Sequence, residues 1–423
     1  MFKYLLFLSL YLPFGLALNF SENFDLASIR LLILLFFFIW LAEGLKNRRI
    51  TVKNNIQTGL ISLFLFLNFF SLFFARDVDW SERKLLYLFS IFPVYFVACG
   101  LIVSASQVEK LIKGLVFSGV AVAALGILQF MSQFIFDLKT AFESWSRIVS
   151  LFLGKNLAET VLENPSWLVN ISGSTYLRAT ATFPDPHMFS LYLGMLMPLA
   201  LGLALVYKNK LWIFAAAIIF LADMLTFSRG GYIGLVGGAL ILFLTFWRRI
   251  EKKYKVAAFL SAALILIIFI APSPVSQRFF SSFNLKEGSN LGRIEMWERA
   301  VETIARHPFI GVGIGNFSLE VNPRVSYRNS ISAHNTYLDI ASESGILAVI
   351  SWIGILGASY LALMKKSKEN RIYLYAGLSL AIFSVHSLVE TGIYSPAVLT
   401  LFLIIVSLSG IKVKNGASDK KIV

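Results

Sequence analysis

The chain has 423 residues, of which 57% belong to the hydrophobic set and only 15% are charged. Soluble domains average about 45–50% apolar and about 25% charged residues, so this composition excludes a soluble enzyme, a disordered protein and a fibrous protein. The formal net charge of +14 does not require a nucleic-acid partner, because the basic residues gather in short segments between long apolar runs.

We predict an all-α, polytopic membrane protein that forms a single integral domain over residues 1–423, with about twelve transmembrane helices. The expected spans are residues 4–18, 29–45, 56–75, 85–103, 114–136, 188–207, 211–227, 232–247, 256–271, 345–364, 372–388 and 398–411. The single cysteine, Cys99, lies in the fourth of these runs, so the chain has no disulfide framework.

The gaps between these spans alternate in charge. Seven of them carry 22 of the 38 Lys and Arg residues and only four acids, and they are residues 1–3, 46–55, 104–113, 208–210, 248–255, 365–371 and 412–423. Short basic loops on alternate sides follow the positive-inside pattern, which predicts that both termini are cytoplasmic.

The first span could instead be a signal peptide cleaved after Gly15-Leu16-Ala17. We favour its retention, because its charged region is the single Lys3 and the cleavage site is weak.

Two gaps are long, residues 137–187 and 272–344, and both fall on the outer face of the predicted topology. In the first, apolar residues recur at helical steps over residues 141–162. This pattern predicts an interfacial helix with Trp145 near the lipid headgroups.

The second long gap predicts a helix over residues 293–306. Ser289 and Asn290 are cap-type residues before this helix, and His307-Pro308 ends it, because the residue before proline avoids helical backbone angles. The residues expected on its apolar face are Ile294, Trp297, Val301 and Ile304.

Polar residues at membrane depth are costly and usually functional. Arg229 lies in Ser228-Arg229-Gly230-Gly231, between two apolar runs and on the side where basic residues are not favoured. Its guanidinium is suited to bind phosphate oxygens through two parallel hydrogen bonds, although it could instead extend to the outer headgroups. Together with Arg178 and Arg293, Arg229 predicts a cationic pocket for an anionic ligand such as pyrophosphate.

His334 is the residue that we expect to accept a proton from an attacking hydroxyl, because imidazole titrates near physiological pH. The alternative is an ordinary hydrogen-bonded loop histidine. Glu343 could orient His334, and Asn335 is a further supporting residue. The remaining candidates receive structural interpretations: a helix cap for His187, a helix end for His307, and a packing hydrogen bond for His386 and Glu390.

Two further motifs are short and common. Asp77-Val-Asp79 has the form of a carboxylate pair that shares a divalent ion, but it lies beside Arg76, Arg83 and Lys84. We therefore expect no metal and no other cofactor. Gly311-Val-Gly-Ile-Gly315 lacks the strand-then-helix context of a dinucleotide-binding loop, so it predicts a turn.

The ordered set of these motifs resembles the O-antigen ligase superfamily. The set comprises Ser228-Arg229-Gly230-Gly231, Gly292-Arg293 with Met296-Trp297, His307-Pro308 with Gly311 to Phe317, and His334-Asn335 with Tyr337, Glu343 and Gly345. The resemblance implies a GT-C type fold and metal-independent, inverting transfer of a glycan from undecaprenyl pyrophosphate to lipid A-core on the periplasmic face of a bacterial inner membrane.

The resemblance also implies roles for individual residues. The family's arginines correspond to Arg178 and Arg229 and its histidine to His334, while Arg293 matches a further basic position. One segment departs from the pattern: relatives often carry Asn-Pro-Asn before the sixth span, whereas this chain has Pro184-Asp185-Pro186-His187.

Three alternative functions stay open. A glycan polymerase would use the same donor with a second lipid-linked glycan as acceptor, and a protein O-oligosaccharyltransferase would label a protein. A lipid-oligosaccharide flippase would place charged residues at mid-depth inside the bundle, whereas the candidate charges here map to one surface.

Overall fold

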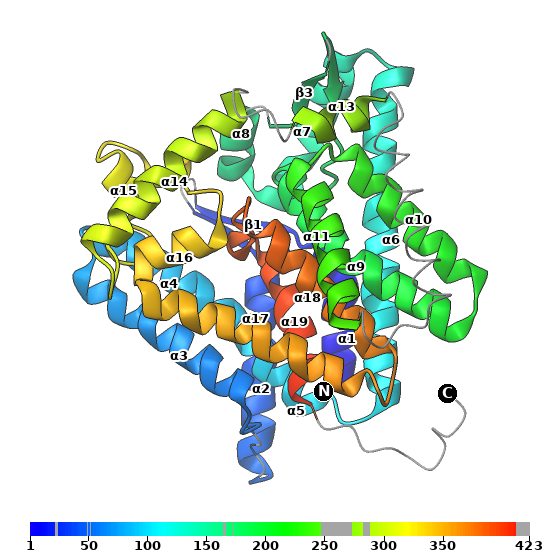
Figure 1. Cartoon of the computed structure of the whole chain (residues 1–423), viewed down its shortest axis with the longest axis vertical. Coiled ribbons are helices and arrows are strands. Elements are labelled where there is room, and N and C mark those ends of the chain that lie inside the picture. The colour runs from blue at the N-terminus through cyan, green and yellow to red at the C-terminus, as the bar shows by residue number, and fades with distance from the viewer. Residues whose placement is uncertain are drawn as a thin grey trace.

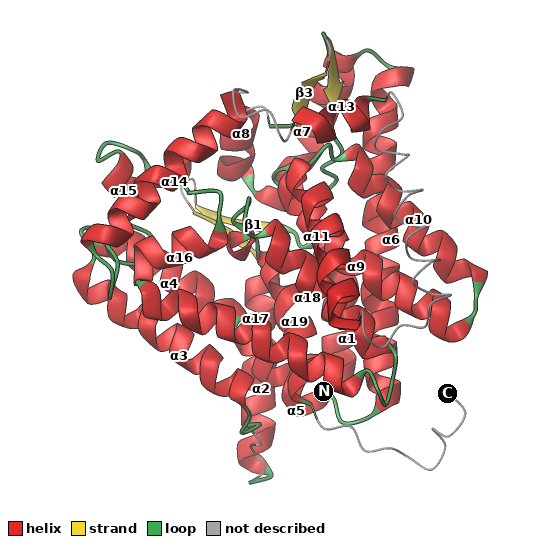
Figure 2. Ribbon diagram, in the orientation of Figure 1, coloured by secondary structure: helices red, strands yellow, loops and turns green. Residues whose placement is uncertain are grey.

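The computed structural model describes residues 1–21, 24–48, 50, 52–163, 166–171, 173–246, 273–281 and 288–411. Within these residues the chain is a bundle of helices, which confirms the predicted all-α class (Figures 1 and 2). Two short antiparallel hairpins accompany the helices: β1 (Ala17–Ser21) with β2 (Phe24–Ala27), and β3 (Leu168–Ile171) with β4 (Ser174–Leu177).

The helices fall into two groups. Those of the apolar bundle are α1 (Phe2–Tyr11), α2 (Ser28–Lys46), α3 (Ile56–Ser71), α4 (Val78–Ile91), α5 (Pro93–Leu101), α6 (Ala105–Ile135), α9 (Pro186–Tyr207), α10 (Lys210–Leu225), α11 (Arg229–Phe246), α17 (Ile346–Lys366), α18 (Ile372–His386) and α19 (Pro396–Gly410). The helices of the two long segments are α7 (Leu138–Leu153), α8 (Lys155–Glu163), α13 (Pro274–Phe280), α14 (Gly288–Arg306), α15 (Phe317–Val321) and α16 (Thr336–Ser344). The short 3₁₀ turns of the described residues are η1 (Leu12–Phe14), η2 (Leu72–Phe74), η4 (Tyr327–Asn329) and η5 (Gly392–Tyr394).

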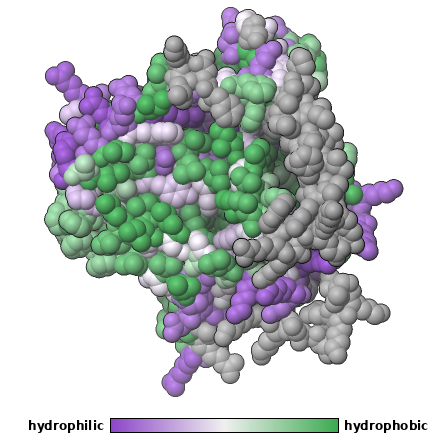
Figure 3. All heavy atoms as spheres, viewed as in Figure 1, coloured by the Kyte–Doolittle hydropathy of each residue, from purple (hydrophilic) through white to green (hydrophobic). Residues whose placement is uncertain are grey.

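The surface of the bundle has the character of a membrane protein. In Figure 3 a broad apolar area covers the middle of the visible face, and hydrophilic residues gather above and below it. Six helical stretches of the described residues are long and apolar enough to cross a membrane, and four apolar helices are shorter. The expected ninth span, residues 256–271, lies outside the described residues. The structure therefore supports a multi-pass helical protein, and the count of twelve stays a prediction.

Hydrogen bonds join the ends of three helices, α3, α17 and α19. Lys366 at the end of α17 donates hydrogen bonds to the carbonyls of Leu408 and Ile411 at 2.7 and 2.5 Å. Asn55, before α3, donates to the carbonyl of Gly410 at 3.3 Å. The start of α3 and the ends of α17 and α19 therefore lie at one end of the bundle.

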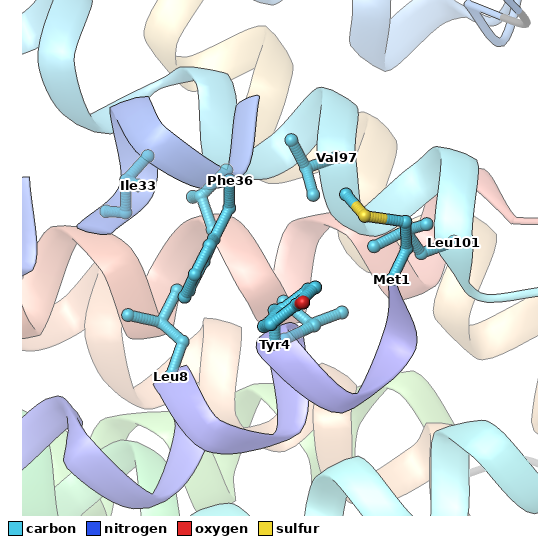
Figure 4. Close-up of a pocket in the computed structure, with 9 residues that line it drawn as sticks. Met1, Tyr4, Leu8, Ile33, Phe36, Val97 and Leu101 are labelled. Carbon is cyan, nitrogen blue, oxygen red and sulfur yellow. The ribbon is translucent and has the colours of Figure 1, made fainter. Parts of the chain in front are cut away.

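An apolar pocket lies near this end. Figure 4 shows Met1, Tyr4 and Leu8 of α1 facing side chains of α2 and α5. No charged side chain is among its lining residues, and Tyr4 supplies the one side-chain hydroxyl. The pocket therefore offers packing space and no group for chemistry.

The first expected span is shorter than predicted. Helix α1 ends at Tyr11, a 3₁₀ turn contains Pro13, and the chain then enters strand β1. Proline at position 13 lacks the backbone N–H that would continue the helix ladder, and it favours a new turn. The apolar run beyond Pro13 therefore pairs with β2 rather than extending the helix.

The expected interfacial helix over residues 141–162 is two helices, α7 and α8, which meet at Gly154. Gly154 has φ +84°, and a Cβ there would lie 2.5 Å from Cγ of Asp25, so the position requires glycine. Asp25 accepts hydrogen bonds from the backbone N–H groups of Asn156 and Leu157 at the start of α8. Trp145 is half-buried, and its indole donates to Ser132 of α6 at 3.0 Å. This helix pair is therefore held against the bundle.

Helix α14 confirms the expected helix and its end before His307, but it begins earlier, at Gly288. Ser289 and Asn290 lie in its first turn rather than before it. Its buried face follows the prediction in part: Ile294, Trp297 and Ile304 are half-buried, whereas Val301 is 56% exposed. Ala300 and Thr303 are the fully buried residues, and Trp297 packs with Ala300 against Phe317 of α15.

The close packing of α11 against α18 sets the position of the candidate site. A Cβ at Gly238 would lie 2.4 Å from Cγ1 of Ile382, and a Cβ at Gly234 would lie 3.0 Å from Cβ of His386. Glycines let two helix backbones approach closely, a frequent device between membrane helices. This contact brings the start of α11, with Arg229, beside the end of α18, four residues before Glu390.

Candidate functional site

The turn between α10 and α11 is held by a buried arginine. Phe227 has φ 49°, a left-handed conformation that costs energy for a residue with a side chain. Arg178 donates from Nε to the carbonyl of Thr226 at 2.7 Å, from Nη2 to that of Phe227 at 3.3 Å, and from Nη1 to that of Ser166 at 2.9 Å. Burial lowers the pKa of Arg178 to about 9, so the group is still charged at neutral pH. Arg178 therefore fixes the backbone that presents Arg229.

Arg229 begins α11 and is only 3% exposed. Its Nη2 donates to Oγ of Ser289 at 2.8 Å, and its Nη1 donates to the carbonyl of Ser281 at 3.2 Å. Arg278 of α13 donates to the carbonyl of Phe227 at 3.5 Å, so it lies at the same turn. These contacts place three guanidinium groups around one turn. Arg278 is not among the residues predicted from the sequence, because it belongs to none of the motifs described above.

The carboxylate of Glu390 is the centre of a second group of residues. Glu390 is 5% exposed and follows α18. Its Oε1 lies 2.9 Å from Nδ1 of His334, and its Oε2 lies 3.3 Å from Nη2 of Arg293 and 3.8 Å from Nδ1 of His187. Burial by itself would raise the pKa of the Glu390 carboxyl, but His334 and Arg293 hold it well below its usual range.

His334 is the most accessible member of this group. Its side chain is 48% exposed, and its backbone has φ 48°, a left-handed conformation. The charge of Glu390 raises the pKa of His334 above its ordinary value, although burial opposes that effect. Because Nδ1 faces Glu390, the other ring nitrogen, Nε2, is the one that can receive a proton from a bound molecule.

Helix α16 places His334 against Glu390. Asn335 caps α16, where its side chain accepts hydrogen bonds from the N–H groups of Tyr337 and Leu338 at 3.0 and 3.1 Å. Thr336 donates from its hydroxyl to the carbonyl of Glu390 at 2.9 Å. The start of α16 is therefore bonded directly to the segment after α18, and Asn335 supports His334 through the backbone.

Asp339 strengthens the same junction. It accepts a hydrogen bond from the N–H of Ala333 at 2.7 Å, just before His334, and another from the hydroxyl of Thr391, just after Glu390. Burial raises the pKa of Asp339 to about 6. One carboxyl group thus ties together the two loops that carry the imidazole and its partner.

Glu343 lies elsewhere. Its two oxygens accept hydrogen bonds from Nζ of Lys84 at 2.7 and 2.9 Å, and Tyr394 donates to it at 3.0 Å. The residue that orients His334 is Glu390, not Glu343. Nine residues along the chain carry Glu343 to the far end of α16, beyond reach of His334.

His187 links the two groups of residues. Its Nδ1 lies 3.0 Å from Oγ of Ser228, beside Arg229, and it faces Glu390 on the other side. The cap of α9 is Asp185, whose carboxylate accepts hydrogen bonds from the N–H groups of His187 and Met188, so our assignment of the cap to His187 was wrong. Burial raises the pKa of Asp185 to about 6.

Two other sequence interpretations change. We predicted packing hydrogen bonds for both His386 and Glu390, but Glu390 bonds to site residues, and both ring nitrogens of the buried His386 are without a hydrogen-bond partner among the described residues. Asp77 caps α4, where it accepts from the N–H of Trp80 at 3.2 Å. Within the described part of the chain, no three His, Cys, Asp or Glu residues are arranged to hold a metal ion. The turn predicted at Gly311 to Gly315 is confirmed.

Together these residues form an arginine-rich turn joined through His187 to an accessible imidazole on a buried carboxylate. Figure 1 shows where they converge: the starts of α11 and α16, the end of α18 and helix α14 approach one another in the same part of the molecule. Guanidinium groups bind phosphate oxygens, and an imidazole oriented by a carboxylate accepts protons. The arrangement is suited to chemistry in which a phosphate-bearing group leaves and a hydroxyl attacks.

Comparison with known proteins supports the same family. Residues 214–353 match the family model described as O-antigen ligase, which confirms the resemblance predicted from the motifs. The chain is also similar to the ComP-specific O-oligosaccharyltransferase of Acinetobacter baylyi, with 27% identity over 241 residues. That match covers 54% of this chain and 42% of the relative. The chain thus matches less than half the length of that relative.

Proposed function

We propose that this chain, which carries a domain of the O-antigen ligase superfamily, transfers a glycan from undecaprenyl pyrophosphate to lipid A-core at the outer face of a bacterial inner membrane. The observation that carries the proposal is the accessible His334, held by the buried Glu390 and joined through His187 to the turn that presents Arg229. In this arrangement Arg229 offers a cation for the leaving pyrophosphate, and His334 offers a proton acceptor for the attacking hydroxyl.

In the proposed reaction the acceptor oxygen attacks the anomeric carbon of the donor sugar. Its proton passes to Nε2 of His334, and a new carbon–oxygen bond forms while the bond from the sugar to pyrophosphate breaks. The electron pair of that bond leaves with the pyrophosphate. Attack opposite the leaving group inverts the anomeric centre.

The arginines are proposed to stabilise the leaving group. Pyrophosphate gains negative charge as the glycosidic bond breaks, so the guanidinium groups bind it more tightly in the transition state than in the ground state. Arg229 and Arg293 are the residues proposed to contact the phosphates. Arg178, whose donors bond to backbone carbonyls, contributes its charge and holds the turn.

A second candidate is protein O-oligosaccharyl transfer, which the printed name of the Acinetobacter baylyi relative favours. The donor half of the reaction would be unchanged, and the acceptor hydroxyl would belong to a protein side chain. A glycan polymerase differs in the same way, with a lipid-linked glycan as acceptor.

Reconstitution of the full chain in liposomes tests the proposal. Purified protein is given an undecaprenyl-pyrophosphate glycan and one acceptor at a time: lipid A-core, a second donor molecule, or a pilin-like peptide. We expect product with lipid A-core and none from the His334→Ala variant. His307→Ala is the matched control, because His307 lies in the same long segment but outside the site, and it should retain transfer. Wild-type rates from His334→Ala would refute the proposal.

A further inference from the structure

A second set of charged and aromatic side chains lies across η5 from Glu390. Its members come from α2, α4, α16, η4 and η5, and we call it the tyrosine–cation cluster: Arg30, Arg83, Lys84, Tyr327, Glu343 and Tyr394. Three of these side chains are cations and one is a carboxylate. None of them contributes to the chemistry proposed above.

One of the three cations is fully compensated. Lys84 forms an ion pair with Glu343 at 2.7 Å, and its ammonium lies 3.9 Å from the centre of the Tyr394 ring. Tyr394 also donates its hydroxyl to Glu343 at 3.0 Å. Glu343 is therefore committed to Lys84 and Tyr394, and the other two cations form no ion pair with a carboxylate of the described part of the chain.

Arg30 is half-buried, and no described residue gives it an acidic partner. Its Nε donates to Oγ of Ser90 at 2.8 Å, and its guanidinium lies 5.3 Å from the centre of the Tyr87 ring. Its two terminal nitrogens have no hydrogen-bond partner among the described residues. Removing a cation from water is costly unless an anion or hydrogen-bond acceptors compensate it. Arg30 therefore has donors in place for a ligand.

Arg83 completes the exposed side of the cluster. Its guanidinium lies 5.1 Å from the centre of the Tyr327 ring, and that ring packs edge-on against Trp80 at 5.1 Å. Tyr327 is 37% exposed, and its hydroxyl lies within electrostatic range of Arg30, Arg83 and Glu343. An accessible aromatic ring beside guanidinium groups that have no carboxylate partner among the described residues suits a molecule with both a flat or ring-shaped face and negative charge.

The cluster is connected to the reactive groups through η5. This 3₁₀ turn begins two residues after Glu390, and the Tyr87 hydroxyl donates to the carbonyl of Ile393 within it at 3.2 Å. Tyr394 of the same turn contacts Glu343 at the end of α16, the helix whose start follows His334. Two substrates must meet at His334, and the arginine-rich turn accounts for one of them.

We propose that the tyrosine–cation cluster binds the anionic saccharide of the acceptor, a sugar that carries phosphate, and presents its hydroxyl to His334. This inference rests on the proposed function and extends it by naming the acceptor site and its charge requirement. Arg30 and Arg83 bind the phosphate, and the Tyr327 ring packs against the sugar.

The test is steady-state kinetics of the full chain in liposomes with three acceptors: lipid A-core with its phosphates, the same glycolipid after phosphatase treatment, and a pilin-like peptide. Arg30→Gln and Arg83→Gln should each raise the KM for the phosphorylated acceptor about tenfold or more, because one charge-assisted hydrogen bond is lost. The KM for the donor should stay unchanged. Arg30→Lys, which keeps the charge, should recover most of the loss. Arg299→Gln, at a residue that is 57% exposed and pairs with Glu302, is the control.

The outcomes separate the two proposals. A KM effect confined to the phosphorylated acceptor supports the acceptor site, and Arg83→Gln gives a result even if Arg30→Gln does not fold, because Arg83 is exposed. Equal effects on both glycolipids, or a raised KM for the donor, overturn it. Transfer to the peptide alone also overturns the acceptor site but leaves glycosyl transfer intact. No transfer by the wild-type chain to any acceptor refutes the proposed function itself.

Discussion

Replacing Glu390 with glutamine tests whether the buried carboxylate controls the reactivity of His334. The substitution keeps the size of the side chain and removes its charge. In the native structure Glu390 is the largest influence that raises the pKa of His334, whereas burial and Arg293 both act to lower it. Removal of this opposite charge should therefore hold His334 at a lower pKa in the Glu390→Gln variant.

Two consequences are expected for the rate. The acid limb of the pH profile of kcat/KM moves to lower pH, because His334 must be neutral to accept a proton and now loses its proton more easily. The plateau falls about tenfold or more, because the ring loses a charge-assisted hydrogen bond that contributes about 1.5–3 kcal/mol.

Stability should follow the same linkage. The raised pKa of His334 means that its pairing with Glu390 stabilises the fold below the ordinary pKa of 6.5, and this contribution is lost as the pH rises through the raised value. The lowered pKa of Glu390 means that its contribution is present above the ordinary 4.5 and is lost as the pH falls through the lowered value.

The measurement is a pH–rate profile of wild type and Glu390→Gln in the same liposomes, with thermal unfolding in detergent at pH 6 and pH 9. A variant whose acid limb stays in place while its plateau falls would show that Glu390 acts on folding alone. A variant with an unchanged profile would refute the role of the carboxylate.

Three further substitutions test the packing that positions the site. Gly238→Ala would place a Cβ 2.4 Å from Cγ1 of Ile382 and should destabilise the fold by about 1–3 kcal/mol, whereas Gly357→Ala, which meets nothing within 4 Å, should not lower the melting temperature. Arg178→Gln leaves buried backbone carbonyls without hydrogen-bond donors, so stability and glycan transfer should fall together, with about 1–3 kcal/mol lost for each unpaired carbonyl. Full stability with no transfer would instead show that Arg178 acts on the donor substrate. Asp25→Ala removes the cap of α8 and should cost about 1 kcal/mol in thermal unfolding while transfer persists, so a complete loss of transfer would contradict a purely structural role.

The sequence by itself determined the class of the protein and much of its layout. Apolar runs and basic gaps are local properties, because each helix needs enough apolar residues to bury its own backbone in lipid. Some helix ends are local properties as well: α14 ends before His307-Pro308, because the residue before proline avoids helical backbone angles. The candidates Arg178, Arg229, Arg293 and His334 were named from the sequence because they stand in segments of unusual polar content, and their roles stay predictions.

Only the tertiary structure decided which of these residues act on one another. The contact between His334 and Glu390 joins positions 56 residues apart, and that between Arg293 and Glu390 joins positions 97 apart. Such pairs depend on how closely whole helices approach, as α11 and α18 do along their glycines, and no local pattern encodes that distance. This is the reason that Glu343 was a reasonable partner for His334 in the sequence, while the carboxylate that folding brings to the imidazole is Glu390.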